Sequence, residues 1–355
     1  MPINNSLTAW AIVSQISGLG NEGLRRLLQN FGSPEAILAA PIAELSRIVK
    51  PSVAQAISRA PNEIDLSPIE TWLADANNHI VTAADHEFPQ ALLNTADPPL
   101  VLYVKGRLDL LNAPALAIVG SRSASVQGLR NAEAFAQTLS DAAICIVSGM
   151  AHGIDSAAHK GALKGQGSSI AVVGTGLDKV YPAANRDLAH LLAEQGAIIS
   201  EFPLGTPPVA SNFPRRNRII SGISAGCLVV EASLQSGSLI SARMAVEQGR
   251  EVFALPGSIH SPQSKGCHFL IKQGAKLVES AQDILEEMGL VFTKPIISVT
   301  EEHPMFAHLG FDLVDLDSLC QRSGLTIPAL SAILLQLELD GKVATSPGGL
   351  YQRIA

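Results

Sequence analysis

The segment Ala115–Ser123 reads Ala-Leu-Ala-Ile-Val-Gly-Ser-Arg-Ser, so that five apolar residues run directly into small residues and an arginine. An uninterrupted apolar run of this length predicts a strand buried on both faces, as strands of a parallel sheet are. The glycine and serine that follow predict a turn whose backbone can come close to a ligand. The segment therefore predicts one strand of a parallel sheet with a functional turn at its end.

Similar short apolar segments alternate with amphipathic segments throughout residues 66–290. The segments Leu129–Leu139, Asp187–Gln195 and Leu239–Gln248 have the periodicity of amphipathic helices. Repeated strand–helix–strand units predict an α/β fold with an extended, Rossmann-like, doubly wound and mostly parallel sheet. The expected strands are Ile80–Thr82, Val101–Val104, Ala115–Val119, Ile144–Ser148, Ser169–Val173, Ala197–Ser200, Cys227–Glu231, Glu251–Leu255 and Lys276–Val278.

Residues 1–65 predict a separate helical domain of helix-hairpin-helix or SAM-like type. Leu7–Ile16 and Leu24–Phe31 have helical periodicity on either side of the turn Gly18-Leu19-Gly20. Glycine amides in such a turn can bind a phosphate, but pairs of short helices also simply pack, so both roles stay open. Ser33-Pro34-Glu35 predicts the N-cap and first turn of the next helix.

The C-terminal end predicts a linker over residues 291–314 and a small winged-helix-like module over residues 315–355. The expected second helix of this module, Ile327–Leu339, contains no arginine or lysine. A helix that reads DNA normally carries side chains able to donate hydrogen bonds, so we favour a packing or partner-binding role for it. The other elements expected in the module are a helix at Leu319–Leu325 and strands at Lys342–Thr345 and Leu350–Ile354.

Composition limits the classes of protein to which this chain can belong. It has 355 residues, of which 47% are hydrophobic, and a formal net charge of −7, which disfavours broad non-specific binding to duplex DNA. The four cysteines are scattered, which argues against a zinc ribbon or a disulfide framework and fits a reducing compartment. We see no signal peptide and no apolar run long enough to span a bilayer, and we therefore expect a cytoplasmic protein without a membrane span.

Four of the expected strands end in small residues, and ligands bind beyond the carboxyl ends of strands in open α/β sheets. Because small residues and helix N-termini both favour close contact with anions, four such turns at one sheet edge predict a phosphate site. The turns are Gly120-Ser121-Arg122-Ser123, Gly149–Gly153, Gly174-Thr175-Gly176 and Ser236-Gly237-Ser238.

A local cationic cluster occurs at Phe213–Gly222, which reads Phe-Pro-Arg-Arg-Asn-Arg-Ile-Ile-Ser-Gly. Arginine presents a planar fork of donors suited to phosphate oxygens, and Phe213 offers a face on which a base could stack. Ile219 and Ile220 predict that this polar turn leads into a buried helix. We interpret the segment as the floor of a site for single-stranded nucleic acid, while a helix start whose arginines pair with surface carboxylates remains the alternative.

Familiar cofactor and catalytic motifs are missing or misplaced. Gly174-Thr175-Gly176 lacks the third glycine of the dinucleotide motif, and no P-loop sequence is present, so we expect no NAD, nucleoside triphosphate or other cofactor. Gly222–Gly226 matches Gly-x-Ser-x-Gly, but it lies between a helix and the following strand, the reverse of a nucleophile elbow. His152 and His159 lack the spacing of metal ligands, and we place His159 in the wall of the site. We therefore expect no metal and no catalytic residue.

The motifs together closely resemble the DNA-processing protein A family (DprA, also named Smf). The resemblance covers residues 92–275 and, less specifically, the three-part layout of the chain. The motifs that carry it, in order, are Gly120-Ser121-Arg122, Ser148–Asp155, Gly176-Leu177-Asp178 with Tyr181-Pro182 and Asn185, Ser200–Pro203, Phe213–Ser221, Glu231 with Ser236–Ile240, and Val252–Gly257.

The resemblance implies a non-enzymatic protein that binds single-stranded DNA, protects incoming DNA and loads the RecA recombinase during natural transformation or DNA recombination. It also implies a homodimer. In the family the Gly-Ser-Arg arginine and the Phe-Pro-x-Arg-Asn-Arg segment line the DNA pocket, while the lysine that many relatives carry near Asn185 is replaced here by Ala183 and Ala184. We expect Lys179, Arg186 or Arg215 to supply that charge. The full set of expected DNA-binding residues is Gly120, Ser121, Arg122, Ser148, Gly149, Gly153, Lys179, Phe213, Arg215, Arg216, Asn217, Arg218, Gly237 and Ser238.

Two alternatives come from other classes of protein. A nucleotide-hydrolysing enzyme of the phosphoribohydrolase-like Rossmann group would carry a glutamate in the turn that reads Ser236–Ser241 here, and no acid is present there. The carboxylates near strand ends, Asp155, Asp178, Glu201 and Glu231, are expected to orient backbone amides or arginines. Alternatively, Leu239–Gln248 and the helices after it could form a docking surface for a dimer or a recombinase.

Overall fold

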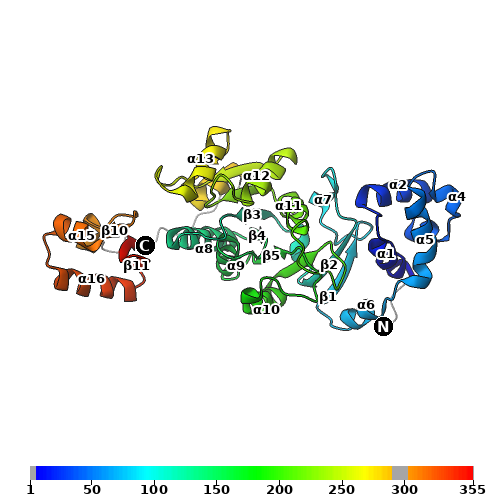
Figure 1. Ribbon diagram of the computed structural model, residues 1–355, viewed down its shortest axis with the longest axis horizontal. Coiled ribbons are helices and arrows are strands. Elements are labelled where there is room, and N and C mark those ends of the chain that lie inside the picture. The colour runs from blue at the N-terminus through cyan, green and yellow to red at the C-terminus, as the bar shows by residue number, and fades with distance from the viewer. Residues whose placement is uncertain (1–4, 290–302, 355) are drawn as a thin grey trace.

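The computed structural model describes residues 5–289 and 303–354. Three parts follow one another along its longest axis: N-terminal helices, an α/β core and a small C-terminal module (Figure 1). No described helix combines the length and apolarity needed to cross a membrane. Much of the predicted linker, residues 291–302, lies outside the described residues. The rest of it differs from the prediction, because Met305 and Leu309 pack into the hydrophobic core of the C-terminal module. The other predicted domain boundaries stay predictions.

The predicted α/β fold is confirmed by a nine-stranded sheet with the strand order β1-β2-β6-β5-β4-β3-β7-β8-β9. Strands β3 to β9 all run parallel, and β2 joins this set antiparallel to β6 with β1 antiparallel at the edge. The strands are β1 (Asn78–Thr82), β2 (Val101–Gly106), β3 (Ala115–Val119), β4 (Cys145–Ser148), β5 (Ser169–Val172), β6 (Ala197–Ser200), β7 (Gly226–Val229), β8 (Glu251–Ala254) and β9 (Lys276–Leu277).

Helices cover both faces of this sheet, and successive strand residues alternate between the two resulting hydrophobic cores. One core forms beneath α7 (Gln90–Leu93), α11 (Asn212–Ile223), α12 (Ser238–Glu247) and α13 (Lys265–Lys272). The opposite face packs against α8 (Val126–Asp141), α9 (Ile154–Ala162), α10 (Arg186–Gln195) and α14 (Ala281–Glu287). This burial on both faces explains why the central strands are short and apolar throughout.

The strand order reverses at β3, because β4, β5 and β6 extend the sheet to one side while β7, β8 and β9 extend it to the other. Loops that leave β3 and β7 therefore diverge, and a crevice opens between them at their carboxyl ends. The register supports this placement, since Val119 pairs with Val229 and the amide of Ser121 donates to the Glu231 carbonyl at 2.7 Å. The topology thus places a binding site beside the Gly-Ser-Arg turn.

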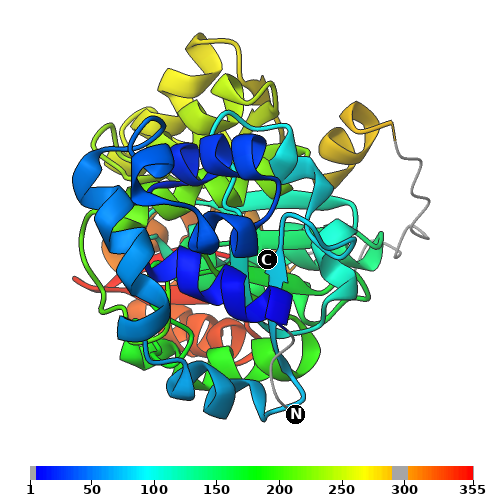
Figure 2. The ribbon, with the colours of Figure 1, turned by 90° about the vertical axis from the view of Figure 1, so that its right-hand side faces the viewer.

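The N-terminal helices pack against the outer strands of the same sheet, in front of the core in Figure 2. Trp10 and Leu27 share a hydrophobic core with Val101 and Tyr103 of β2. Ser33 caps the third helix as predicted, accepting from the Ala36 amide at 3.2 Å. The helices of this part are α1 (Asn5–Gln15), α2 (Asn21–Phe31), α3 (Pro34–Ala39), α4 (Ile42–Leu45), α5 (Pro51–Glu63) and α6 (Ser67–Leu73).

The C-terminal module has the predicted order of two helices followed by a β wing. Helices α15 (Leu316–Ser323) and α16 (Ile327–Leu339) precede β11 (Val343–Ser346) and β12 (Leu350–Arg353). A short strand, β10 (Val314–Asp315), pairs with β12 and completes a three-stranded sheet. The module has its own core, which includes Leu319, Leu330 and Leu334.

A glycine in α9 allows close packing of α8 and α9 on one face of the sheet. A Cβ atom on Gly161 would lie 2.1 Å from the Glu133 carbonyl oxygen of α8, a contact that the backbone must move to relieve. We predict that Gly161→Ala lowers the free energy of unfolding of the core by about 1–3 kcal/mol, as overpacking does. Urea unfolding followed by circular dichroism measures this change.

Gly20→Ala is the matched control, because no atom lies within 4 Å of a Cβ built there and its φ is −81°. Equal unfolding midpoints for the two variants would contradict the close approach of α8 and α9.

Candidate nucleic-acid interface

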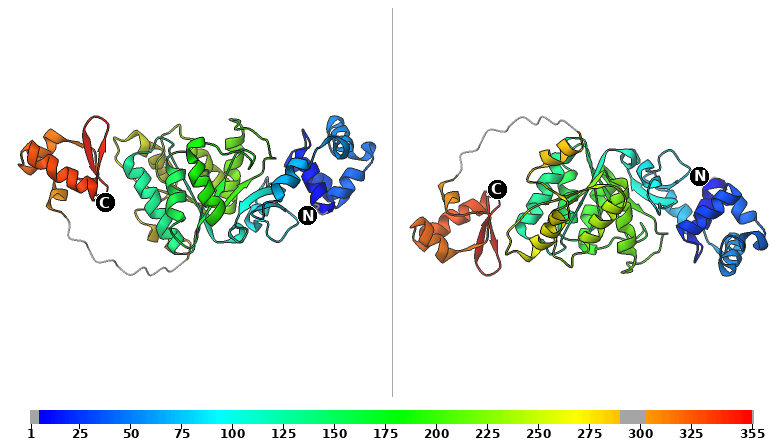
Figure 3. Two further views of the ribbon diagram at one scale, coloured as in Figure 1. Left: turned by 90° about the horizontal axis from the view of Figure 1, so that it is seen from below. Right: turned by 90° about the horizontal axis from the view of Figure 1, so that it is seen from above.

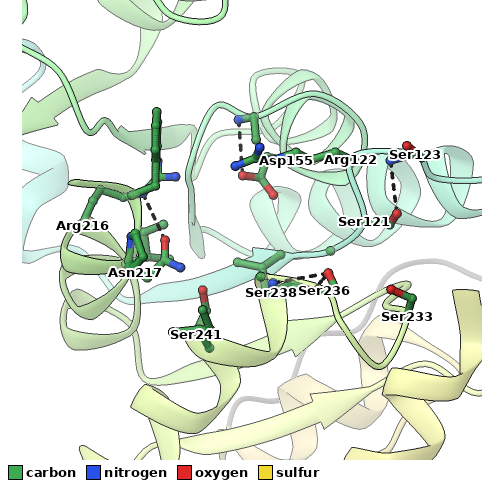
Figure 4. A pocket seen from close by; sticks show the side chains of 18 of the residues that line it. Ser121, Arg122, Ser123, Asp155, Arg216, Asn217, Ser233, Ser236, Ser238 and Ser241 are labelled. Carbon is green, nitrogen blue, oxygen red and sulfur yellow. Dashed lines mark hydrogen bonds between the residues drawn. The ribbon is translucent and has the colours of Figure 1, made fainter. Parts of the chain in front are cut away.

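A pocket of about 730 Å³ opens at the crevice between β3 and β7. Figure 4 shows Arg216 and Asn217 on one side of it, Ser121 and Arg122 on another, and the serines near the start of α12 along a third. Its lining is Val119, Gly120, Ser121, Arg122, Ser123, Ala151, Asp155, Tyr181, Pro208, Ala210, Phe213, Pro214, Arg216, Asn217, Ile220, Ser233, Ser236, Gly237, Ser238, Ile240, Ser241 and Gln263.

The turn after β3 is held by a carboxylate at the end of β7. Glu231 accepts from the Ser125 amide at 2.9 Å and from the Ser125 hydroxyl at 2.6 Å. Ser125 is in turn the N-cap of α8 and accepts from the Gly128 amide. These bonds fix the loop at both ends and leave the Arg122 side chain exposed at its tip. The geometry suits Arg122 to contact an anion, because its backbone is held while its guanidinium faces water.

Phe213 lies close to two guanidinium groups in the pocket wall. Its ring centroid is 6.0 Å from Cζ of Arg122 and 5.9 Å from Cζ of Arg216, distances typical of cation–π contacts. Tyr181 adds a second ring at 5.6 Å, tilted by 40°. Helix α11 begins at Asn212, so the Phe-Pro-Arg-Arg sequence forms its first turn and is not a turn that precedes the helix. The predicted buried helix that follows is confirmed by Ile219 and Ile220.

Arg216 is buried and tied to the ends of two strands. Its Nη1 donates to the Gly149 carbonyl at 2.5 Å and to the Val172 carbonyl, and only 5% of the residue is exposed. Burial lowers the pKa of Arg216 to about 10, although the Asp155 carboxylate opposes this shift. Burial has the opposite effect on Asp155 and raises the pKa of its carboxyl group. The Asp155 carboxylate accepts from the amides of Gly149 and Ala151. Arg216 therefore contributes positive charge to the pocket floor and also holds the strand ends together.

The N-terminus of α12 forms the remaining wall. Gly237 is its N-cap and has no side chain to cap the helix, while the Ser236 and Ser238 hydroxyls contact each other at 2.7 Å. Ser238 and Ser241 lie on the first turn of this helix, and both line the pocket. Backbone amides at a helix N-terminus carry partial positive charge and favour anions. The wall thus combines hydroxyl groups with a positive dipole end.

The predicted site residues divide into those that line the pocket and those that support it. The lining includes Gly120, Ser121, Arg122, Phe213, Arg216, Asn217, Gly237 and Ser238. Ser148 and Gly149 lie behind the wall, where Ser148 donates to the Ile118 carbonyl at 2.6 Å. Gly153 has a φ of +81°, and a Cβ atom there would lie 2.3 Å from the Ser121 carbonyl oxygen. Of the four predicted turns, the one at Gly174–Gly176 lies behind Phe213.

Arg215, Arg218 and Lys179 lie outside this lining. Arg218 pairs with Glu201, contacts Asp97 at 3.3 Å and has a side chain only 12% exposed. Arg215 is 58% exposed, lies over the Phe202 ring and reaches Glu201 at 3.8 Å. Lys179 is exposed and donates to the Gly205 carbonyl. Contact of these three residues with DNA stays a prediction. The ion pairs of Arg218 with Asp97 and Glu201 agree with the alternative interpretation, in which the arginines of this segment pair with carboxylates.

The carboxylates near strand ends have the orienting roles that the sequence predicts. Asp155 and Glu231 hold backbone amides, Asp178 accepts from the Gly205 amide at 2.8 Å, and Glu201 binds arginines. His159 is fully buried behind the pocket, where its Nε2 accepts from the Met150 amide at 3.3 Å. Burial lowers the pKa of His159 to about 3, so this ring is neutral. Within the described residues, no group of three His, Cys, Asp or Glu side chains could hold a metal ion.

Sequence reasoning missed several lining residues. Tyr181 belongs to a quoted motif, yet only the fold shows that its ring meets Phe213. Ser233 and Gln263 carry no local signal, because they reach the pocket through loops that follow β7 and β8. Gln263 donates to the Ser123 carbonyl at 3.2 Å and so contacts the turn that carries Arg122. An isolated serine or glutamine in a loop is too common for its type alone to predict such a role.

Comparison with known proteins places this chain in a family. Residues 79–289 match the family model described as DNA recombination-mediator protein A, and residues 295–349 match that of the DprA winged helix domain. The chain belongs to the DNA recombination-mediator protein A family. It is similar to Protein Smf of Escherichia coli, with 47% identity over 80% of this chain and 79% of that protein.

Two solved structures of family members are similar to this fold. DNA processing protein A (DprA) from Streptococcus pneumoniae is 38% identical with a TM-score of 0.71, covering 82% of this chain and all of that one. DNA processing protein A from Helicobacter pylori is 30% identical with a TM-score of 0.54, covering 59% of this chain and 95% of that one. The second structure concerns a unique single-stranded DNA binding mode of the Helicobacter pylori protein.

The two arginines of the pocket are predicted to differ in their effect on stability. Arg216→Met leaves the Gly149 and Val172 carbonyls without their donor and the buried Asp155 without its compensating charge. We expect a loss of about 3 kcal/mol in the free energy of unfolding, as when one partner of a buried charge pair is removed. Chemical denaturation measures this value.

Arg122→Met serves as the matched control, since the exposed side chain should change stability by less than about 0.5 kcal/mol. Adding Asp155→Asn to Arg216→Met should restore part of the loss. A stability of Arg216→Met equal to that of Arg122→Met would show that the buried contacts contribute nothing.

Proposed function

We propose that this family member binds single-stranded DNA in the pocket between β3 and β7. The observation that carries the proposal is the placement of the Phe213 ring close to the guanidinium groups of both Arg122 and Arg216. A strand could set one phosphate against Arg122 and the start of α12 while a base stacks on the exposed part of the Phe213–Tyr181 pair. The Helicobacter pylori relative, described by its single-stranded DNA binding mode, supports the same ligand class.

The shape and charge of the protein favour a single strand over a duplex. Stacking on an aromatic ring requires an unpaired base whose face is free. The net charge of −7 disfavours a broad electrostatic surface for duplex DNA, so affinity must come from a small cationic site. Arg122 and Arg216 provide such a site, and the N-terminus of α12 adds backbone donors that carry no formal charge.

The hydrogen bonds and ion pairs of the carboxylates near the strand ends agree with a non-catalytic role. Asp155, Asp178, Glu201 and Glu231 each hold backbone amides or arginines, which occupies the groups that acid–base catalysis would need. The phosphoribohydrolase alternative is not favoured, because the turn at Ser236–Ser241 presents hydroxyls where that group of enzymes carries a glutamate. We therefore propose that the protein is a DNA-binding mediator and not an enzyme.

The bound strand would then be protected and passed to a recombinase. We propose that the protein works in the cytoplasm as a homodimer and loads RecA on single-stranded DNA during natural transformation or recombination. Exposed apolar side chains on and near α12 and α13, such as Val246, Ile259 and Phe269, provide surface for such contacts. RecA-catalysed strand exchange on DNA coated with single-strand binding protein should accelerate when this protein is added, and an unchanged rate would contradict the loading role.

Salt titration separates the contributions of charge and stacking in the pocket. We predict that Arg122→Ala weakens binding of a labelled oligothymidylate roughly tenfold and lowers the slope of log affinity against log salt by about 0.7. Phe213→Leu should weaken binding by on the order of 1–3 kcal/mol while the slope stays unchanged, because a stacked ring contributes no counterion release. Fluorescence anisotropy over a salt series measures both quantities.

Arg243→Ala is the matched control, since it removes the same charge from an exposed position on α12 that does not line the pocket. It should leave both affinity and slope near those of the unmodified protein. If Arg122→Ala behaved like Arg243→Ala, the pocket would not be the DNA site.

A further inference from the structure

Two loops build the side of the pocket that carries Tyr181. The loop after β5 holds Tyr181 itself, and the loop after β6 supplies Pro208 and Ala210 before α11 begins. Tyr181 is 45% exposed, so its own packing does little to fix the ring. The loop after β5 is anchored beyond the ring by Asn185, whose side chain donates to the Met150 carbonyl at 2.8 Å. The contacts that hold this loop before the ring therefore decide where Tyr181 lies.

The two loops are bonded to each other. The Gly176 amide donates to the Thr206 carbonyl at 3.1 Å, and the Gly205 amide donates to the Asp178 carboxylate at 2.8 Å. The Lys179 side chain also donates to the Gly205 carbonyl, at 2.6 Å. Because the loops are paired in this way, a shift of the loop after β6 is passed to the loop after β5.

Each loop has one leucine that packs toward the N-terminal part of the protein. Leu177 and Leu204 are partly buried, and both pack against the hydrophobic core that the N-terminal helices share with β1 and β2. Trp10 of α1 and Leu27 of α2 belong to that core. Figure 3 shows the N-terminal helices at the end of the α/β core opposite the C-terminal module. Part of the apolar support of both pocket loops thus comes from the first helices of the chain.

A polar contact joins the same two regions. Asn21, the first residue of α2, donates to the Glu201 carboxylate at 3.5 Å. Glu201 begins the loop after β6, its side chain is only 5% exposed, and it pairs with Arg218 of α11. The start of α2 therefore lies beside a carboxylate, which disfavours the binding of a phosphate at the turn Gly18-Leu19-Gly20 before it.

The charge of the N-terminal helices also argues against direct contact with DNA. A DNA-binding surface normally carries a basic patch. The formal charges of residues 5–65 cancel instead, because the basic side chains Arg25, Arg26, Arg47, Lys50 and Arg59 are matched in number by the acidic side chains Glu22, Glu35, Glu44, Glu63 and Asp65. An effect of these helices on DNA binding must therefore pass through the loops that they support.

We propose that the N-terminal helices strengthen DNA binding without touching the strand, through Leu177 and Leu204 as positioning residues for Tyr181. The inference rests on the proposed function of the pocket. The shared hydrophobic core holds both leucines, the paired loops hold Tyr181, and Tyr181 is kept against Phe213 before DNA arrives. A base that stacks on rings already in place does not have to order them, so the affinity is higher.

A double-mutant cycle on the full-length chain tests this route. Leu204→Ala should weaken binding of a labelled oligothymidylate roughly twofold to tenfold, the cost of ordering one side chain on binding. The slope of log affinity against log salt should not change, because no charge is removed. In a Tyr181→Ala background, Leu204→Ala should have little further effect, whereas a general structural defect would add to the loss. Fluorescence anisotropy measures all four chains.

Leu73→Ala is the matched control, because Leu73 on α6 is also partly buried against the same core but lies on neither pocket loop. It should leave affinity unchanged, and the conservative Leu204→Met should restore most of the affinity that Leu204→Ala loses. If circular dichroism showed Leu204→Ala to be unfolded, the smaller change Leu204→Val takes its place in the same cycle.

The inference is overturned if folded Leu204→Ala binds as tightly as Leu73→Ala, or if it weakens binding equally with and without Tyr181. It is also overturned if Tyr181→Ala binds normally while Phe213→Leu binds weakly. In each of these cases the pocket remains the DNA site, since its own test depends on Arg122 and Phe213.

Discussion

A buried guanidinium holds the pocket together. Arg216 lies on the first turns of α11, yet its Nη1 donates to the carbonyls that follow β4 and end β5. Asp155 at the start of α9 balances its charge and also fixes the amides of the intervening loop. One side chain therefore couples a helix on one face of the sheet to a helix on the other. Because a buried arginine must satisfy its donors, the strand ends cannot move apart without a large cost.

This constraint leaves Arg122 as the more accessible of the two charges. Glu231 and Ser125 fix the loop that carries it, so the guanidinium is held in position by its backbone while its side chain stays in water. The Phe213 ring lies close to both arginines and so connects the buried charge to the exposed one. An acidic protein can hold an anionic strand under these conditions, because the attraction acts over a few ångströms while screening weakens more distant repulsion.

The N-terminal and C-terminal parts of the chain pack differently relative to the α/β core. The N-terminal helices share a hydrophobic core with β2, so they extend the sheet's own packing. The C-terminal module has a separate core, and Arg130 of α8 donates a hydrogen bond to its Gly341 carbonyl at 3.0 Å.

The sequence by itself determined the alternation of strands and helices, the turn at the end of β3 and the aromatic–arginine segment of α11, because each depends on local periodicity or residue type. It also predicted that Arg122 and Phe213 belong to one site, and the two side chains do lie close together. Only the tertiary structure decided that Arg216 is buried, that Arg218 is paired with Glu201, and that Tyr181 and Gln263 reach the same pocket. Those outcomes depend on which loops meet at the reversal of strand order, and such long-range contacts leave no local pattern in the sequence.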